Sequence, residues 1–268
     1  MTSNEKYKEF IIPKLKEFWT DHKEDYIKSG LNNGLFLPHV FDGYDECDKK
    51  IFYIGQDVPY WLFQEQMVEL FNAGKFEEYL KINNEVLQPL GKRMAWGNSP
   101  AAFWTMVNKL HLYLLTEEWK QDINKISKKE EKLLDSVGYS NISYVPIMKS
   151  IVNYGDWNKI DPERYVDTLK ALFPMEQLQG IVSSFDPDII VVLTNFVNEL
   201  TAVNFLKGIN ISWNALFDDF EPSVHVGEFK YSNKKRIIVW TSNPNRYRFI
   251  GTNMYEVSAL IKKAIELS

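Results

Sequence analysis

Four short apolar runs, each bounded by polar or turn residues, dominate the pattern of the chain. They are rich in β-branched and aromatic residues, which is typical of buried parallel strands. The runs are KIFYIG (50–55), ISYVPI (142–147), DIIVVLT (188–194) and RIIVWTS (236–242). The stretch EFKYSNKK (228–235) predicts a hairpin that leads into the last strand, with SNKK as its turn.

Between these runs, apolar residues return at the spacing of an amphipathic helix. Residues 61–74 show this spacing and end at a glycine. A second helix is expected to start with Ser99 as its cap and Pro100 in its first turn. The last one is expected after Thr252.

Strands that alternate with helices imply a parallel sheet covered on both faces. The predicted fold is therefore α/β, a three-layer α/β/α sandwich with a central four-stranded parallel sheet. The sequence has no internal repeat and no Pro/Gly/Ser-rich linker, so residues 1–268 are expected to form a single domain with an N-terminal helical extension. The charged stretch 117–135 is expected to be a solvated helical excursion.

Composition and charge bear on which partners, disulfides and membrane contacts can be expected for this chain. The net charge of -5 does not favour a nucleic-acid partner, although 31 Lys and Arg residues can still cluster on one surface. The single cysteine, Cys47, excludes an intrachain disulfide framework and a cysteine-rich metal site. The chain has no apolar signal core near its first residue and no run of membrane-spanning length, so we expect a cytoplasmic protein without a membrane partner.

Polar residues next to the predicted strands are the first candidates for a site, because open parallel sheets bind ligands beyond the carboxyl ends of their strands. Asp57 follows the first strand. A carboxylate there can act as a general base or stabilise a cation, and it can equally cap the helix that begins near Pro59. Asn141 precedes the second run, where its amide has the donor and acceptor that a nucleobase edge needs, and an asparagine there is also typical of a turn.

The loop after the last strand, SNPNRYR (242–248), combines short donors with positive charge. Such a loop can hold a phosphate or donate to an oxyanion, and an Asn-Pro turn with solvated arginines fits the same letters. Other chemistries lack support, since the chain has no phosphate-loop lysine motif, no GxGxxG after a strand and no GxSxG. The four histidines lack metal-ligand spacing, so no metal is expected, and His111 is expected to be structural.

The stretch IGQDVPYW (54–61) resembles the water-activating motif GQDPYH of the uracil-DNA glycosylases, base-excising enzymes with a three-layer α/β sandwich. Three segments follow it in the order of that family. NISYVP (141–146) resembles the region of a base-reading Asn, PDIIVVLTN (187–195) resembles the third strand, and SNPNRYR (242–248) resembles a loop that reads HPS or NPS in the family.

The resemblance implies a role for each matching residue. Asp57 would activate water and stabilise the oxocarbenium-like sugar, and Asn243 would donate to the uracil oxygen that gains charge. Asn141 would pair with the Watson–Crick edge of the flipped base, Gln56 would offer its backbone amide, and Tyr60 would shape the pocket against a 5-methyl group. Further substrate-binding candidates are a stacking ring (Trp96, Phe103 or Trp104), Ser242 and Arg246.

The resemblance therefore predicts a DNA glycosylase of the uracil type, a hydrolase of base excision repair that needs no cofactor. We expect a monomer that acts on a flipped uracil or another damaged base in single- or double-stranded DNA. The chain departs from the motif by an inserted Val58 and by Trp61 in place of the family's His. Two alternatives stay open: a non-catalytic relative that binds a nucleobase, nucleotide or nucleic acid, and a protein-interaction scaffold.

Overall fold

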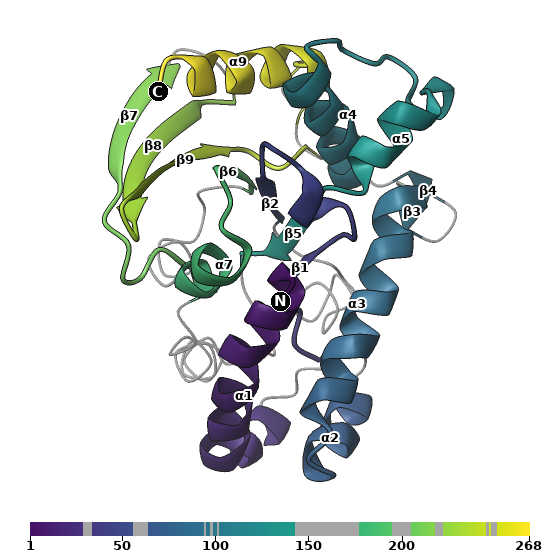
Figure 1. The fold of residues 1–268 in the computed structure, drawn as a ribbon, viewed down its shortest axis with the longest axis vertical. Helices are drawn as coiled ribbons and strands as arrows, with labels where there is room; N and C mark the ends of the chain where they lie inside the picture. Colours follow the sequence, from purple (N-terminus) through teal and green to yellow (C-terminus); the bar gives the residue numbers. More distant parts are fainter. Residues whose placement is uncertain are drawn as a thin grey trace.

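A seven-stranded mixed β-sheet lies at the centre of the fold, in the order β1-β5-β2-β6-β9-β8-β7 (Figure 1). The computed structural model describes residues 1–28, 34–55, 64–93, 95–96, 99–100, 102–142, 177–194, 205–217, 222–244, 247 and 251–268. The strands of the sheet are β1 (His39–Val40), β2 (Ile51–Gly55), β5 (Gly138–Asn141), β6 (Ile189–Leu193), β7 (Ser212–Phe217), β8 (Val224–Tyr231) and β9 (Lys234–Thr241). The predicted α/β class is confirmed.

The sheet is wider than the predicted one of four parallel strands. Strands β5, β2, β6 and β9 pair in parallel, whereas β1 is antiparallel to β5, and β8 and β7 extend the other side antiparallel. The additional strands escaped prediction because β1 has two residues and β7, SWNALF, has no strict alternation.

The second predicted strand, 142–147, was misplaced. Strand β5 spans Gly138–Asn141 instead, and residues 143–147 lie outside the described part of the chain. Its sequence GYSN has low β-propensity, so pairing in register with β2 defines it as a strand. A glycine is needed at position 138, because a Cβ there would overlap the ring of Phe52.

The predicted hairpin is confirmed as the β8–β9 pair. Tyr231 lies opposite Lys234, so the turn consists of Ser232 and Asn233. Both turn residues have positive φ, 49° and 64°, as a type I′ turn requires.

Helices lie on both faces of the sheet (Figure 1). They are α1 (Ser3–Lys28), α2 (Gln64–Asn72), α3 (Phe76–Arg93), α4 (Ala102–Thr116), α5 (Lys128–Leu134), α7 (Gln177–Phe185) and α9 (Met254–Glu266), with short 3-10 helices η1 (Tyr44–Glu46) and η2 (Ile123–Lys125). Helix α9 confirms the prediction for the segment after Thr252, and α2 confirms a helix from Gln64 to Asn72, whereas residues 61–63 lie outside the described ranges. Asn253 caps α9 in a capping box with Glu256.

The predicted start of the second helix is wrong. Ser99 and Pro100 form β4 (Ser99–Pro100), which pairs with β3 (Ala95–Trp96) in a separate two-stranded ribbon. Helix α4 therefore begins at Ala102, without Ser99 as its cap. A Ser-Pro pair is typical of a helix start, but here these two residues pair with Ala95 and Trp96 in a strand instead.

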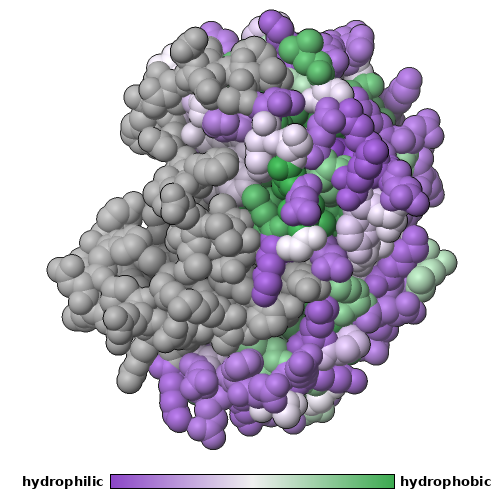
Figure 2. Space-filling model, turned by 90° about the vertical axis from the view of Figure 1, so that its left-hand side faces the viewer, coloured by the Kyte–Doolittle hydropathy of each residue, from purple (hydrophilic) through white to green (hydrophobic). Residues whose placement is uncertain are grey.

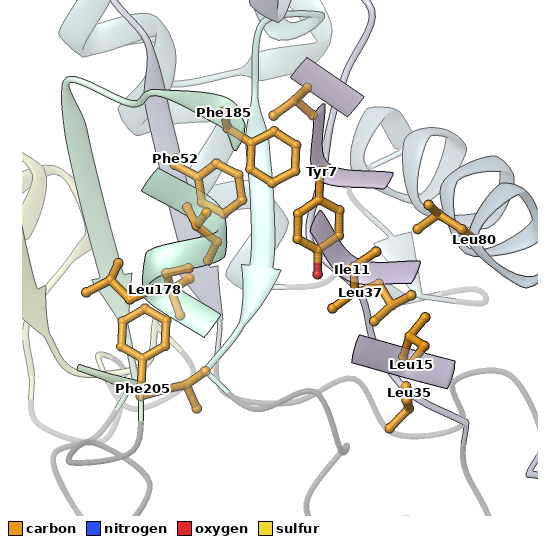
Figure 3. Packing of buried hydrophobic residues seen from close by; sticks show 14 of the residues in the cluster. Tyr7, Ile11, Leu15, Leu35, Leu37, Phe52, Leu80, Leu178, Phe185 and Phe205 are labelled. Carbon is orange, nitrogen blue, oxygen red and sulfur yellow. The ribbon is translucent and has the colours of Figure 1, made fainter. Parts of the chain in front are cut away.

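Alternate residues of the central strands pack into two separate cores. Ile190 and Val192 of β6 face helices α1, α2, α3 and α7, whereas Val191 and Leu193 face α4 and α9. This alternation is expected for a strand that is buried on both faces. Figure 3 shows how Tyr7 of α1 packs beside Phe185 in the first core.

The charged stretch 117–135 contains η2 and α5. Ser127 caps α5 in a capping box with Glu130, which sets where the helix starts. The segment is held by a small core of its own, made of Leu112, Ile123 and Leu134.

Strand β7 is the last strand of the sheet on its side, and the ring of Trp213 on it is 36% exposed. Figure 2 views the molecule from this side and shows hydrophobic residues near the middle of the view, next to mostly hydrophilic residues in the described part of this face. Gly227 of β8 makes room for this ring, because a Cβ there would lie 2.9 Å from Cε3 of Trp213.

Candidate functional site

The carboxyl ends of β5, β2 and β6 meet at one edge of the sheet, with Asn141, Gly55 and Leu193 in register. Strand β5 follows β2 in the chain and pairs on one side of it, whereas β6 and β9 lie on the other side. The strand order therefore reverses at β2. Open parallel sheets bind their ligands at such a switch point.

Asn141 brings an unsatisfied donor to this point. Its side chain is fully buried, and its Oδ1 accepts a hydrogen bond of 2.8 Å from the hydroxyl of Tyr139. Its Nδ2 has no hydrogen-bond partner among the described residues. A buried donor without a partner costs about 1–3 kcal/mol, so this amide is available to a ligand at an energetic cost to the free protein.

Gln177, the first residue of α7, braces the end of β5. Its Nε2 donates to Ser140 Oγ at 3.1 Å and to the backbone carbonyl of Asn141. Its Oε1 is buried and has no partner within the described ranges. The backbone of Asn141 is thus fixed from the face opposite to its side chain.

Phe103, in the first turn of α4, lies over Gly55. A Cβ on Gly55 would lie 3.0 Å from Cε2 of Phe103 and 2.9 Å from the hydroxyl of Tyr139, so a glycine is required for this close approach. The rings of Phe103 and Tyr139 lie 5.1 Å apart. Phe103 is partly exposed, which leaves part of its ring free to contact a ligand at the end of β2.

The other two candidate rings are placed differently. Trp104 is buried in the core, where its ring lies 4.6 Å from that of Tyr139 and 6.2 Å from that of Phe41. The backbone of Trp96 belongs to β3, and its side chain lies outside the described part of the structure. Among the described side chains, Phe103 is the ring in position to stack on a ligand at this edge.

His39 of β1 was not predicted to be part of a site. It is 4% exposed and lies opposite Tyr139 in the pairing of β1 with β5. Neither ring nitrogen has a hydrogen-bond partner among the described residues. Burial lowers its pKa to about 4, and the nearby charge of Asp42 opposes this shift, so the ring is neutral at pH 7.

Ser242 and Asn243 follow β9 at the same edge of the sheet as Asn141, but β2 and β6 lie between them. Three strand spacings separate the ends of β5 and β9 by about 14 Å. The carbonyl of Ser242 accepts a hydrogen bond of 3.0 Å from the hydroxyl of Tyr247. Both side chains are partly exposed. Ser242 and Asn243, the two predicted donors, thus lie at the same edge as Asn141 but on the other side of the switch point.

The remaining predicted site residues lie outside the described part of the chain. They are Gln56, Asp57, Tyr60 and Arg246. Of the predicted site residues, the structure therefore brings together Asn141 and Phe103, which both contact Tyr139. The role of Asp57 rests on the sequence alone.

Tyr139 and Gln177 are the other residues that sequence reasoning missed at this edge. Tyr139 precedes Asn141 by two positions, which is the period of one strand face, but the misplaced second strand concealed this relation. Gln177 stands far from the motifs in the sequence and reaches Asn141 only through the packing of α7. No local pattern marks it.

His111 serves as the contrast to His39. It is fully buried, and its Nδ1 lies 3.2 Å from the hydroxyl of Tyr53. Its Nε2 lies 2.9 Å from Ser136 Oγ and 3.1 Å from the carbonyl of Leu133. Burial lowers its pKa to about 4. Both ring nitrogens are engaged, as expected of a structural histidine.

The described ranges contain no group of three or more His, Cys, Asp and Glu side chains that could hold a metal ion. None of the helices in them has the length and apolar character needed to cross a bilayer. No protein-family model, curated protein or solved structure matches this chain.

Proposed function

We propose that this chain is a DNA glycosylase of the uracil type, which hydrolyses the N-glycosidic bond of a flipped uracil or another damaged base. The observation that carries the proposal is the buried, unpaired Nδ2 of Asn141 beside Gly55, the first residue of the GQD motif. A buried donor that lacks a partner in the free protein is accounted for if a ligand supplies the acceptor. A nucleobase edge carries such acceptors.

The arrangement of the four motif segments supports a uracil-DNA glycosylase-like fold. The GQD motif follows β2, Asn141 ends β5, the third segment is β6, and SNPNRYR follows β9. These are the four strands that pair in parallel. Segments that are distant in the sequence thereby reach one edge of the sheet.

Phe103 is the ring that we assign to stacking on the base. It is partly exposed over Gly55 and is backed by Tyr139. Stacking of a base on an aromatic ring contributes about 1–3 kcal/mol to binding. The base must also leave the DNA stack, which costs a few kcal/mol and favours single-stranded or mismatched sites.

Asp57 and Asn243 are the residues that we assign to catalysis. Breaking the base–sugar bond leaves positive charge on the sugar and negative charge on the base. The carboxylate of Asp57 would stabilise the sugar cation and orient water, and Asn243 would donate to the base oxygen. One such donor is typically worth about 3 kcal/mol in the transition state.

A non-catalytic protein that binds a free nucleobase or nucleotide is the second candidate. The net charge of -5 favours it, because a DNA-binding surface needs positive charge. It would use the same Asn141 and Phe103, so it differs from the first candidate only in what happens at Asp57.

Excision from single- and double-stranded oligonucleotides that contain uracil tests the proposal. We expect abasic product from the native chain and a loss of at least 100-fold in rate for Asp57→Asn. The matched control is Asp48→Asn, which removes an exposed carboxylate before β2 and is expected to leave the rate unchanged. Binding without product, in the native chain and in Asp57→Asn alike, would establish the second candidate instead.

A further inference from the structure

His39 is a buried histidine whose two ring nitrogens both lack partners among the described residues. Such a group destabilises the free protein, because burial removes its water and supplies no replacement. His111, equally buried, has both nitrogens hydrogen-bonded. The difference calls for a partner of His39 beyond the described residues, and a bound ligand can supply one.

The pairing of β1 with β5 places His39 on the same face of the sheet as Asn141. His39 lies opposite Tyr139, and residues that pair across two strands project to the same face. Tyr139 and Asn141 are two positions apart in one strand, so they also share a face, and the hydrogen bond between their side chains agrees with this. The unpaired atoms of His39 and Asn141 therefore belong to one surface of the sheet, the one that α4 covers.

The spacing between the two residues suits one small ligand. His39 and Asn141 are diagonal neighbours across two adjacent strands, a relation that places Cα atoms about 7–8 Å apart. Tyr139 lies directly opposite His39 in the register, and its hydroxyl donates to Asn141. A flat ring with polar atoms on two edges can reach both side chains over such a distance.

We propose that His39 contacts the same ligand as Asn141 and is the second polar anchor of the site. The proposal rests on the proposed function, in which that ligand is a nucleobase. A neutral imidazole offers one donor and one acceptor, and the amide of Asn141 offers a free donor. Ligand binding would therefore satisfy the donor of Asn141 and the one ring nitrogen of His39 that faces the ligand, both of which are open among the described residues.

A stability measurement separates this role from a structural one. Phenylalanine keeps a flat aromatic ring at this position, larger than imidazole by one ring atom, and His39 already lies beside an aromatic ring, that of Phe41 at 6.1 Å. His39→Phe removes two unsatisfied nitrogens, so the melting temperature should stay the same or rise. A histidine whose ring nitrogens stabilise the fold would instead lower the melting temperature when it is replaced by phenylalanine.

Binding is measured by titration of a uracil-containing single-stranded oligonucleotide and of free uracil, in an Asp57→Asn background that prevents turnover. His39→Phe and Asn141→Leu are each expected to weaken binding at least tenfold. His39→Gln, which restores a donor and an acceptor, should recover part of the loss. His22→Phe, on α1, is the matched control and should bind like the parent.

The possible outcomes distinguish a failure of the role of His39 from a failure of the proposed function. If Asn141→Leu loses binding and His39→Phe binds within twofold of the parent, the role of His39 is overturned and the proposed function stands. If His39→Phe does not fold, His39→Gln takes its place, and parent-like melting with tenfold weaker binding would support the role. If the parent binds neither probe, both the proposed function and this inference are overturned.

Discussion

The two edges of the sheet differ in how their polar groups are satisfied. At the amino edge, Asp188 accepts from the backbone N–H of Lys50 at 2.8 Å and pairs with Lys234 at 2.8 Å. Buried Arg236 donates there to two backbone carbonyls and to Asp186, with only its Nε unpaired among the described atoms.

At the carboxyl edge, by contrast, several buried polar atoms are left open. Asn141, Gln177 and His39 each keep at least one atom without a partner in the described residues. Charged groups at the amino edge are thus paired with one another or with the backbone, although the hydroxyl of Tyr44, which lies near Asp186 and Asp188, is also buried without a partner in the described residues. The carboxyl edge differs because its open atoms lie at or beside the switch point, where open parallel sheets bind ligands.

Acid is expected to have the largest effect on stability. Burial lowers the pKa of His39 and of His111 to about 4, so the unfolded chain binds more protons than the folded one below pH 6.5. The stability that these residues contribute is complete above about pH 6.5 and is lost as the pH falls toward 4. At pH 5 each costs about 2 kcal/mol, or about 4 kcal/mol together.

Urea unfolding at pH 7.5 and pH 5 measures this loss. In His39→Phe the loss between the two pH values should fall by about half, because the contribution of His39 is removed and that of His111 stays. A loss equal to that of the native chain would mean that His39 is not a buried, neutral histidine in the folded protein. The carboxyl edge would then have two residues with open buried atoms, Asn141 and Gln177.

Substitutions at the two edges should change the free energy of unfolding by different amounts. Asp186→Asn keeps a side chain that tolerates the positive φ of 48° at this position and removes the charge that faces Arg236. We expect a loss of about 1–2 kcal/mol, since Arg236 is buried but the carboxylate of Asp186 is half exposed and screened. Asn141→Leu, at the other edge, should stay within about 1 kcal/mol of the native chain.

Chemical denaturation of both variants at pH 7.5 checks this contrast. Equal losses would show that Asn141 supports the fold as Asp186 does, and its unpaired amide would then have no bearing on ligand binding.

The sequence predicted those parts of the fold whose signal is local. Strands β2, β6 and β9 are runs of buried β-branched and aromatic residues, so hydrophobicity alone identifies them. Strand β5, GYSN, is a strand only because β2 pairs with it, and the paired residues, such as Gly55 and Asn141, lie 86 positions apart in the chain. Pairing between distant segments has no local signature.

The candidate site divides in the same way. Asn141 was found through a motif, whereas His39 and Gln177 belong to no motif and are recognisable only by the atoms that packing leaves unsatisfied. The predicted start of α4 failed for a related reason, because Ser99 and Pro100 pair with β3. Unsatisfied atoms and pairing between strands are properties of the folded protein, so no local sequence pattern predicts them.

A small stability effect, and the sharpest test of the carboxyl edge, is expected from Tyr139→Phe. The substitution removes the hydroxyl that donates to Asn141 Oδ1 and keeps the ring that packs against Phe103 and Trp104. The free energy of unfolding should fall by about 1 kcal/mol or less. The amide of Asn141 would lose the bond that fixes its orientation, so its donor would no longer point in one direction.

The informative quantity is the ratio of affinities for oligonucleotides with uracil and with cytosine at the same position. We expect this ratio to fall about fivefold in Tyr139→Phe, which corresponds to about 1 kcal/mol of lost discrimination. A purely structural role of the hydroxyl would weaken both ligands equally and leave the ratio unchanged. In that case packing alone would orient Asn141, and the open donor at this edge would be set by the backbone of β5 and its brace from Gln177 rather than by Tyr139.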